Sequence, residues 1–252
     1  MTKIIMHGCN GKMGQVITDI CNHDPECEIV AGIDISDHIK TNPYPVFKSV
    51  NECNVKADVV IDFSTATCVD ALLDWCKEKH LPLVLCTTAL SDETVNKVML
   101  YSKEVAILRS ANMSVGINML LKELKNVASL LAPSGFDIEI VEKHHNQKID
   151  APSGTALALA DSINESLNNE YHYVYDRTVK REKRDQKEIG ISAVRGGSIV
   201  GEHEVIFAGR DEVITITHTA YSKAIFANGA VQAAKYLAGK PEGLYDMSKV
   251  IE

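Results

Sequence analysis

Short apolar runs alternate with amphipathic stretches of helical length along the first 112 residues. In the first of these stretches Met13, Val16, Ile17 and Ile20 recur at helical spacing. The expected strands are 3–8, 27–34, 57–64, 81–88 and 105–111, and the expected helices are 12–23, 66–79 and 91–103, the last capped by Ser91. Strands alternating with helices of this length predict βαβ units and a parallel sheet with both faces covered.

The pattern changes after residue 112. The expected elements are a helix at 115–131, a strand at 136–145, a helix at 152–167, and strands at 190–195, 198–209 and 211–220. The short turn near Gly209 predicts that the last two strands form an antiparallel hairpin. A closing helix at about 223–238 is ended by Gly239 and Pro241. The chain is therefore predicted to hold an α/β front domain and an α+β domain with a mixed sheet.

Composition and charge narrow the class of protein. The 252 residues are 45% hydrophobic and 24% charged, which is ordinary for a globular chain, and the net charge of −8 argues against a nucleic-acid partner. The charged run at 180–188 mixes both signs and is expected to be a solvated loop. Neither a signal peptide nor a run of 18 apolar residues is visible, so we expect a cytoplasmic protein with no membrane contact.

The seven cysteines do not suggest a disulfide framework or a metal site. Their number is odd, no two of them form a C-x-x-C pair, and none clusters with histidines. We expect buried or partly exposed reduced thiols and no bound metal.

The sequence "GCNGKMG", residues 8–14, lies directly between the first strand and the first helix. Gly8 permits a sharp turn, Gly11 lets the backbone approach a pyrophosphate, and Gly14 allows close packing of helix and strand. The start of the helix then offers N–H groups to phosphates, and Lys12 adds a positive charge. The alternative is a tight βα turn that binds no ligand.

An acidic residue at the end of the second strand favours the dinucleotide interpretation. Asp34 comes 20 residues after Gly14, where a carboxylate holds the adenosine ribose. Ile35 and Ser36 follow instead of an arginine, so NADH is at least as acceptable as NADPH, although Lys12 or a later lysine could accept a 2′-phosphate.

Small and polar residues follow the other strands of the front domain. Ligands of open parallel sheets bind outside the carboxyl ends of the strands, so these residues are suited to the nicotinamide half of a cofactor. Each of them alone is more often a plain junction between strand and loop, and the argument rests on the set. Its members are Phe63, Ser64, Cys86, Thr87, Thr88, Ser110, Ala111, Asn112 and Met113.

The segment "EIVEKHHNQKIDAPSGTA", residues 139–156, contains the candidate proton chemistry. Alternation places Ile140, Glu142 and His144 on one face of a strand, and His144, His145 and Lys148 then lie near one loop. Adjacent histidines point to opposite faces of a strand, which disfavours metal binding. A histidine can deliver a proton and a lysine supplies a positive charge.

The start of the next helix adds a second half to this segment. Ser153 or Thr155 can cap the helix, and the backbone N–H groups of Gly154 and Thr155 offer a seat for a carboxylate. A solvated polar turn explains the stretch equally well when it is taken alone.

The same segment resembles a known family. The run Glu139-Ile-x-Glu142-x-His144-x-x-x-Lys148-x-Asp150-x-Pro152-Ser153-Gly154-Thr155-Ala156 is similar to the signature of the 4-hydroxy-tetrahydrodipicolinate reductase family, also called dihydrodipicolinate reductase. The resemblance covers nearly the whole chain. It extends to "GCNGKMG" and to residues 110–121, 199–207 and 226–247.

The resemblance implies NADH- or NADPH-dependent reduction of 4-hydroxy-tetrahydrodipicolinate to tetrahydrodipicolinate, with loss of water, on the diaminopimelate route to lysine. It implies His144 as proton donor or acceptor, Lys148 as second proton donor facing the substrate, and His145, Gly154 and Thr155 as carboxylate ligands. It implies cofactor contacts at Gly8, Cys9, Asn10, Gly11, Lys12, Met13, Asp34, 86–88 and 110–113.

The resemblance also implies an assembly and a domain division. The family is typically a homotetramer joined through the sheet of the second domain. Residues 1–112 and 224–252 would form the dinucleotide-binding domain, and residues 113–223 the substrate and tetramerisation domain.

Three positions depart from the family pattern. Cys86 and Met113 stand where glycine and phenylalanine are common, and Lys223 stands where arginine often binds the substrate, which keeps the charge but loses a bidentate fork.

Two other functions compete with the reductase interpretation. One is a dehydrogenase of the glucose–fructose oxidoreductase or aspartate dehydrogenase type, and the other is a non-catalytic NAD(H) sensor, against which the His144 and Lys148 pair argues.

Overall fold

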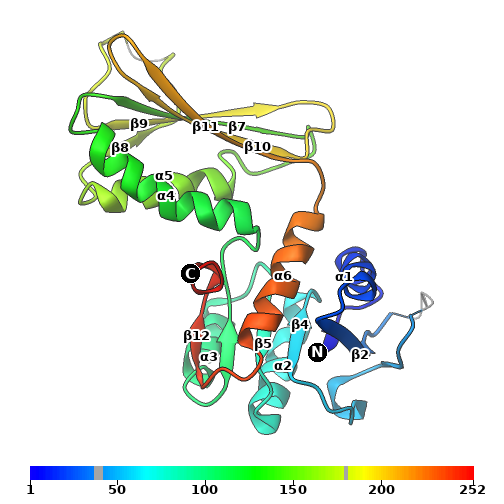
Figure 1. Cartoon of the computed structure of the whole chain (residues 1–252). Helices are drawn as coiled ribbons and strands as arrows, with labels where there is room; N and C mark the ends of the chain where they lie inside the picture. Colours follow the sequence, from blue (N-terminus) through cyan, green and yellow to red (C-terminus); the bar gives the residue numbers. More distant parts are fainter. Residues whose placement is uncertain (37–41, 179–180) are drawn as a thin grey trace. The chain divides into compact units, whose positions relative to one another are not determined.

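The computed structural model of the chain describes residues 1–36, 42–178 and 181–252. It divides into two compact units, one of residues 1–115 with 224–252 and the other of residues 116–223 (Figure 1). The sequence placed the first crossing three residues earlier, between 112 and 113, and the second at the same place, between 223 and 224. Within the described ranges, no helix has the length and apolar character needed to cross a membrane.

The first unit contains a seven-stranded sheet in the order β12-β6-β5-β4-β1-β2-β3, in which all the strand pairs are parallel. This confirms the predicted parallel sheet. Its strands are β1 (Thr2–His7), β2 (Cys27–Ile33), β3 (Val46–Phe47), β4 (Val59–Asp62), β5 (Leu83–Leu85), β6 (Ala106–Leu108) and β12 (Gly243–Tyr245). Its helices are α1 (Lys12–His23), α2 (Ala66–Lys79), α3 (Asp92–Tyr101), α6 (Ala224–Leu237) and α7 (Met247–Val250), with a 3₁₀ turn at η1 (Val50–Glu52).

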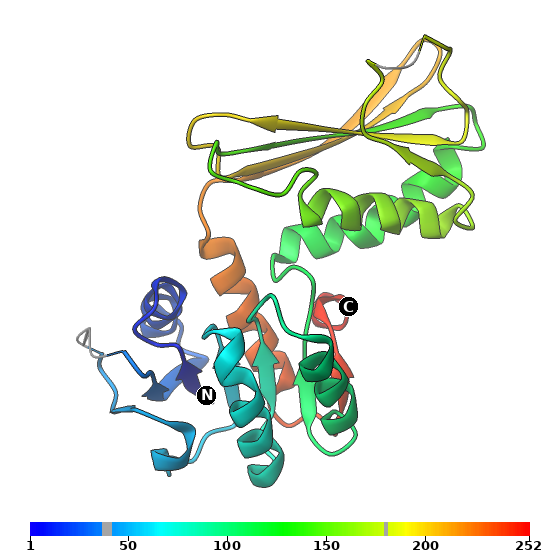
Figure 2. The same cartoon turned by 180° about the vertical axis from the view of Figure 1, so that it is seen from behind.

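Both faces of this sheet are buried. Ile4 and Met6 of β1 belong to a core cluster shared with α1 and α6, whereas Ile5 belongs to a cluster shared with α2. Strands covered on both faces are apolar at successive positions, which is why "KIIM" reads as a continuous run. Figures 1 and 2, seen from opposite sides, show α6 beside β4 and β5, although more than 130 residues separate them in the chain.

The second unit contains a five-stranded mixed sheet in the order β11-β10-β7-β9-β8. β10 pairs antiparallel with both β11 and β7, which confirms the predicted hairpin, and β7 and β8 pair parallel with β9. The strands are β7 (Asp137–His144), β8 (His172–Val174), β9 (Glu188–Arg195), β10 (Gly201–Ala208) and β11 (Val213–Ala220), and the helices are α4 (Val115–Leu131) and α5 (Gly154–Ser166).

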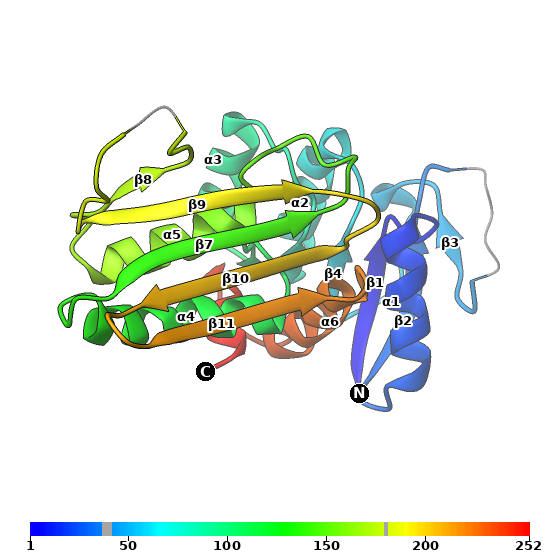
Figure 3. The same ribbon diagram turned by 90° about the horizontal axis from the view of Figure 1, so that it is seen from above.

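Only one face of this second sheet carries helices of its own unit. Figure 1 shows α4 and α5 on one side, and Figure 3 shows the strands from the other side. The alternation of buried and partly exposed residues along β10 agrees with that arrangement, since Val205 and Phe207 are buried and their neighbours are not. The opposite face presents Val141, Val194 and Ile206 among polar residues.

The charged run at 180–188 differs from the solvated loop expected of it, and Lys180 lies outside the described residues. Arg184 is largely buried and donates hydrogen bonds to Glu139, to Asp137 and to the carbonyls of Ile138 and Glu188. The prediction was wrong for Arg184 because its partners lie on β7, about 45 residues earlier in the chain. No local pattern indicates such a partner.

Gly229 tests how closely α6 packs in the first unit. A Cβ atom at this position would stand 1.6 Å from the carbonyl oxygen of Met113, so Gly229→Ala requires a backbone shift. We expect Gly229→Ala to lower the free energy of unfolding by about 1–3 kcal/mol, the usual cost of overpacking, in a denaturant titration. Gly196→Ala, where an added Cβ meets nothing within 4 Å, is the control. Equal stability of the two variants would contradict the prediction.

Candidate active site

The strand order of the first unit brings the predicted cofactor residues into one row. Residues following β6, β5, β4, β1 and β2 emerge at the carboxyl edge of the sheet in that spatial order. The row starts with 110–113, continues with 86–88, 63–64 and the glycine turn at 8–14, and ends at Asp34. Ligands of open parallel sheets bind at this edge, and an elongated dinucleotide matches an elongated row.

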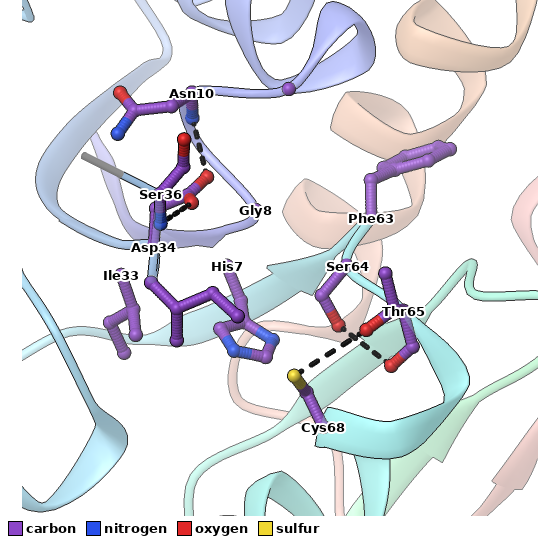
Figure 4. Close-up of a pocket in the computed structure, with 12 residues that line it drawn as sticks. His7, Gly8, Asn10, Ile33, Asp34, Ser36, Phe63, Ser64, Thr65 and Cys68 are labelled. Carbon is purple, nitrogen blue, oxygen red and sulfur yellow. Dashed lines mark hydrogen bonds between the residues drawn. The ribbon is translucent and has the colours of Figure 1, made fainter. Parts of the chain in front are cut away.

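A pocket of about 250 Å³ lies at the Asp34 end of the row (Figure 4). Gly8 has a φ of +83°, and a Cβ there would stand 2.6 Å from the carbonyl oxygen of Phe63, so the turn requires glycine. None of the described residues lining the pocket is Lys or Arg. The lining residues are His7, Gly8, Asn10, Gly11, Ile33, Asp34, Ile35, Ser36, Phe63, Ser64, Thr65 and Cys68.

The beginning of α1 suits a phosphate. Its N-cap residue is Gly11, which has no side chain to cap the helix, and the first turn carries no acidic residue. The first N–H groups of a helix have no partner within the helix, so they are open to an anion here. Asp34 accepts hydrogen bonds from the N–H groups of Asn10 and Ser36, both at 2.8 Å, which fixes its carboxylate beside this turn.

Three of the predicted cofactor residues, Cys9, Thr87 and Met113, are buried. The side chains of Cys9 and Met113 are buried in the core, so any ligand contact there involves the backbone. Burial also raises the pKa of the Cys9 thiol to about 11, which keeps it inert. The Thr87 hydroxyl is buried without a hydrogen-bond partner in the described chain, which fits a position that a bound cofactor completes.

In the second unit, the register of the sheet gathers the predicted substrate residues at one edge. His144 ends β7 and pairs with Arg195 at the end of β9, while Gly201 begins β10 and pairs with Ala220 at the end of β11. Lys223 is exposed three residues beyond that end. The edge therefore carries His144 together with the segment leading to Lys223.

The buried carboxylate of Glu142 organises this edge. It is fully buried and accepts two hydrogen bonds from Arg195, at 2.6 and 2.7 Å, and one from the Ser153 N–H at 2.9 Å. His144 Nδ1 makes the fourth, at 2.6 Å. Burial by itself raises the pKa of Glu142, but the hydrogen bonds from Arg195, His144 and Ser153 outweigh it and hold the pKa below its usual value.

The Glu142 contact defines the tautomer of His144. A carboxylate accepts, so Nδ1 carries the hydrogen and Nε2 is the atom that exchanges a proton with a ligand. Nε2 lies over Gly201, where an added Cβ would come within 3.2 Å of it, and it has no hydrogen-bond partner among the residues described. His144 thus has one nitrogen fixed by the protein and one available for chemistry.

His203 is packed edge-on against the His144 ring, with ring centroids 5.1 Å apart. It is buried, and Nε2 lies 3.0 Å from Ser153 Oγ. Burial, followed by the nearby charge of His144, lowers the pKa of His203 from 6.5 to about 4. His203 is therefore neutral at pH 7.

The loop between β7 and α5 holds the remaining candidates. Lys148 forms an ion pair with Asp150 at 2.8 Å, and that hydrogen bond lowers the pKa of Asp150. Ser153 is the N-cap of α5 and its Oγ accepts from the Ala156 N–H, which confirms one of the two caps predicted. Gly154 is exposed at the first helical position, where its N–H has no partner among the described residues.

Sequence reasoning gave no role to three side chains that surround His144. Glu142 was placed on the correct face but assigned no function, and Arg195 and His203 were not singled out. The hydrogen-bond partners of Arg195 and His203 lie 53 and 50 residues away in the chain, so strand pairing is needed to see them. The only available signal was that Glu142 and His144 stand two residues apart on one strand face.

A parallel sheet with a glycine turn and an acidic residue after its second strand, followed by a unit with a fixed histidine, is typical of a dinucleotide-dependent oxidoreductase. Models of the dihydrodipicolinate reductase N-terminus and C-terminus match residues 2–113 and 116–251. The chain belongs to the dihydrodipicolinate reductase family, as its sequence motifs predicted. It is an NAD(P)H-dependent oxidoreductase.

Similar proteins agree with this assignment. The chain is 50% identical to 4-hydroxy-tetrahydrodipicolinate reductase of Clostridium novyi, over 100% of the chain and 99% of that protein. It is 51% identical to the enzyme of the same name from Caldanaerobacter subterraneus, with the same coverage. Among solved structures, dipicolinate-bound dihydrodipicolinate reductase from Paenisporosarcina sp. TG-14 shares the fold, with a TM-score of 0.81, 24% identity, and coverage of 98% of this chain and 97% of that one.

Dehydrogenases of much lower identity also share the fold. A myo-inositol dehydrogenase from Corynebacterium glutamicum matches with a TM-score of 0.56 and 14% identity, over 94% of this chain and 87% of that one. Similarity at this level reports the fold and carries no argument about the substrate.

The pKa of His203 makes stability depend on pH. Because the folded-state pKa lies below the unfolded value of 6.5, the folded protein binds this proton more weakly, and stability is lost as the pH falls from 6.5 toward 4. The loss amounts to about 3 kcal/mol. His203→Gln retains a hydrogen-bond partner for Ser153 but cannot take up this proton. Between pH 7 and pH 4 we expect its free energy of unfolding, measured in urea titrations, to fall by about 3 kcal/mol less than that of the wild type.

The control is His23→Gln, which changes an exposed histidine on α1 and should follow the wild-type curve. If His203→Gln also follows the wild-type curve, the assigned neutral state of His203 is wrong.

Proposed function

We propose that this chain reduces 4-hydroxy-tetrahydrodipicolinate to tetrahydrodipicolinate with NADH or NADPH, on the diaminopimelate route to lysine, and that His144 is its proton donor. The observation that carries the proposal is the contact of His144 Nδ1 with the buried, Arg195-bound carboxylate of Glu142. A histidine held in this way has one defined nitrogen for proton exchange.

The first unit supplies the cofactor half-site. The N–H groups of residues 12–14, at the start of α1, hold the pyrophosphate, and Asp34 holds the adenosine ribose hydroxyls. The loops at 86–88 and 110–113 line the nicotinamide end, whereas Phe63 and Ser64, expected there from the sequence, line the pocket at the Asp34 end. When bound, NADH or NADPH supplies the hydride.

Reduction consumes one hydride and one proton and releases one water. His144 Nε2 delivers the proton, and the negative charge of Glu142 stabilises the imidazolium form that exists before transfer. Arg195 keeps Glu142 ionised and in place, so Glu142 and Arg195 are positioning residues. Removing one member of such a buried pair would leave the other charge uncompensated.

The loop and the start of α5 supply the rest of the substrate half-site. Lys148 adds a second proton donor and a positive charge, and His145 contributes a further donor. The N-terminus of α5 at Gly154 and Thr155, with Lys223 at the same sheet edge, holds the two carboxylates of a dicarboxylate ring. Separation of Lys148 from its ion pair with Asp150 would free it for a substrate.

We also propose that the enzyme works in the cytoplasm as a homotetramer that assembles through the uncovered face of the second sheet. Val141, Val194 and Ile206 lie on that face between charged neighbours such as Lys143 and Glu202. β-branched residues on a long paired sheet face are typical of a surface that packs against another copy.

Replacement of Lys148 tests the catalytic assignment. We expect Lys148→Ala to lower kcat by about 10²- to 10⁴-fold, because a positioned proton donor contributes that much. The assay is loss of NADH and NADPH absorbance with freshly made 4-hydroxy-tetrahydrodipicolinate. NADH affinity, measured by fluorescence, should not change.

Lys125→Ala, which breaks an exposed ion pair on α4, is the matched control and should keep wild-type turnover. Near-normal kcat in Lys148→Ala would reject the role of Lys148. A wild-type enzyme that oxidises neither cofactor with this substrate would reject the proposed function itself.

A charge on the uncovered sheet face tests the assembly. We expect Ile206→Asp to convert the tetramer into smaller species in light-scattering measurements, because a buried unpaired carboxylate destabilises an interface. Leu130→Asp, at a side chain 70% exposed on α4, should leave the tetramer intact. An unchanged mass for Ile206→Asp would place the interface elsewhere.

A further inference from the structure

The first unit contains a buried, hydrogen-bonded histidine–aspartate pair that the proposed chemistry does not use. His7 Nδ1 lies 2.7 Å from Asp62 Oδ1, at the carboxyl ends of the adjacent strands β1 and β4. His7 is 6% exposed and Asp62 is fully buried. The three residues before His7 in β1, Ile4 to Met6, are apolar and belong to the two core clusters of this unit, so a polar pair at the end of the strand calls for an explanation.

Stability alone does not explain the pair. Removing two groups of this kind from water is costly, and apolar side chains of similar volume usually serve a core as well or better. One oxygen of Asp62 even lacks a hydrogen-bond partner in the described part of the chain. The pair therefore costs solvation without complete compensation inside the protein, which points to a ligand-facing role.

The open side of the pair faces the pocket at the Asp34 end of the sheet. His7 is among the residues that line this pocket, and Figure 4 shows its ring between the Asp34 side and the side formed by Ser64 and Cys68. Asp62 Oδ1 also accepts from the Ser64 N–H at 3.2 Å, so the pair fixes the loop opposite Asp34. His7 and Asp62 thus join the turn after β1 to the loop after β4.

The contact with Asp62 defines which hydrogen-bonding group His7 offers. A carboxylate accepts, so Nδ1–H donates to Asp62 and Nε2 is left with a lone pair. Nε2 has no hydrogen-bond partner among the described residues. The floor of the pocket therefore presents one fixed acceptor.

The position of this acceptor indicates its ligand. The start of α1 takes the phosphates and Asp34 the ribose hydroxyls, so the base occupies the part of the pocket lined by His7, Ile35 and Thr65. Adenine offers a single strong donor on its edge, the exocyclic amine, beside acceptor nitrogens. An acceptor in the pocket floor is complementary to that amine.

We propose that His7, oriented by Asp62, recognises the exocyclic amine of adenine and makes the site selective for adenine dinucleotides. This inference rests on the cofactor placement under the proposed function. It adds a base-reading residue that the glycine turn and Asp34 do not provide. Asp62 acts through His7 and is a positioning residue.

The test compares NADH with reduced nicotinamide hypoxanthine dinucleotide, in which a carbonyl replaces the amine. We expect the wild type to bind NADH about five- to twentyfold more tightly, because the analogue loses one hydrogen bond and sets two acceptors against each other. In His7→Phe, which keeps a ring but removes the acceptor, the ratio of the two dissociation constants should fall to about two or less. His23→Phe, at an exposed histidine on α1, should keep the wild-type ratio.

Two further variants keep the outcome readable. The double variant His7→Phe/Asp62→Leu replaces His7→Phe if that variant folds poorly, because it leaves no buried carboxylate without a partner. It too should lose the discrimination between the two dinucleotides. Asp34→Ala should weaken both dinucleotides equally. If Asp34→Ala has no effect, the cofactor placement fails. If Asp34→Ala does weaken binding, two results would overturn the role of His7 alone. One is a wild type that binds both dinucleotides equally well, and the other is a His7→Phe variant that keeps the wild-type ratio.

Discussion

The hydrogen-bonded carboxylate of Glu142 is the constraint on which the second unit depends. A buried carboxylate is tolerated only when its oxygens are satisfied, and here four hydrogen bonds satisfy them. The donors come from β7 itself, from β9 and from the residue that caps α5. Placing Glu142 inside therefore fixes the pairing of β7 with β9, the return of the loop to Ser153 and the orientation of His144. The fold and the site therefore share one set of interactions.

The first unit follows a simpler constraint, which is why the sequence indicated so much of it. Apolar runs at strand length alternate with helical patterns, and right-handed crossovers then bring the carboxyl ends of the strands to one edge. Gly8, Asp34 and the loop residues at 63–64 and 86–88 could be placed in one crevice from that rule alone. Strands β3, β8 and β12 were not predicted, because they have two or three residues and, unlike the equally short β5 and β6, do not lie within a longer apolar run.

The functional partners missed by the sequence share one property. Glu142 and Arg195 are 53 residues apart, His7 and Asp62 are 55 apart, and Arg184 and Glu139 are 45 apart. The first two contacts are made across neighbouring strands, and in the third Arg184, which lies before β9, contacts β7. All three depend on strand order and register and on no local pattern. The candidate residues in one contiguous loop, from His144 to Thr155, were within reach of sequence reasoning because the chain itself keeps them together. The residues that orient His144 were not.

His144 and His203 show how the same side chain serves different ends. His144 has a carboxylate at Nδ1 and, within the described part of the chain, no hydrogen-bond partner at Nε2, so it can exchange a proton at a defined atom. His203 contacts a hydroxyl, and its pKa of about 4 keeps it neutral, so it can pack 5.1 Å from His144 without placing a second positive charge beside an imidazolium. A protonated His203 would repel the proton from His144 and weaken it as a base. The neutrality of one ring is thus a condition for the acid–base work of the other, and the hydrogen bond from His203 to Ser153 ties that condition to the helix start proposed to hold the substrate carboxylates.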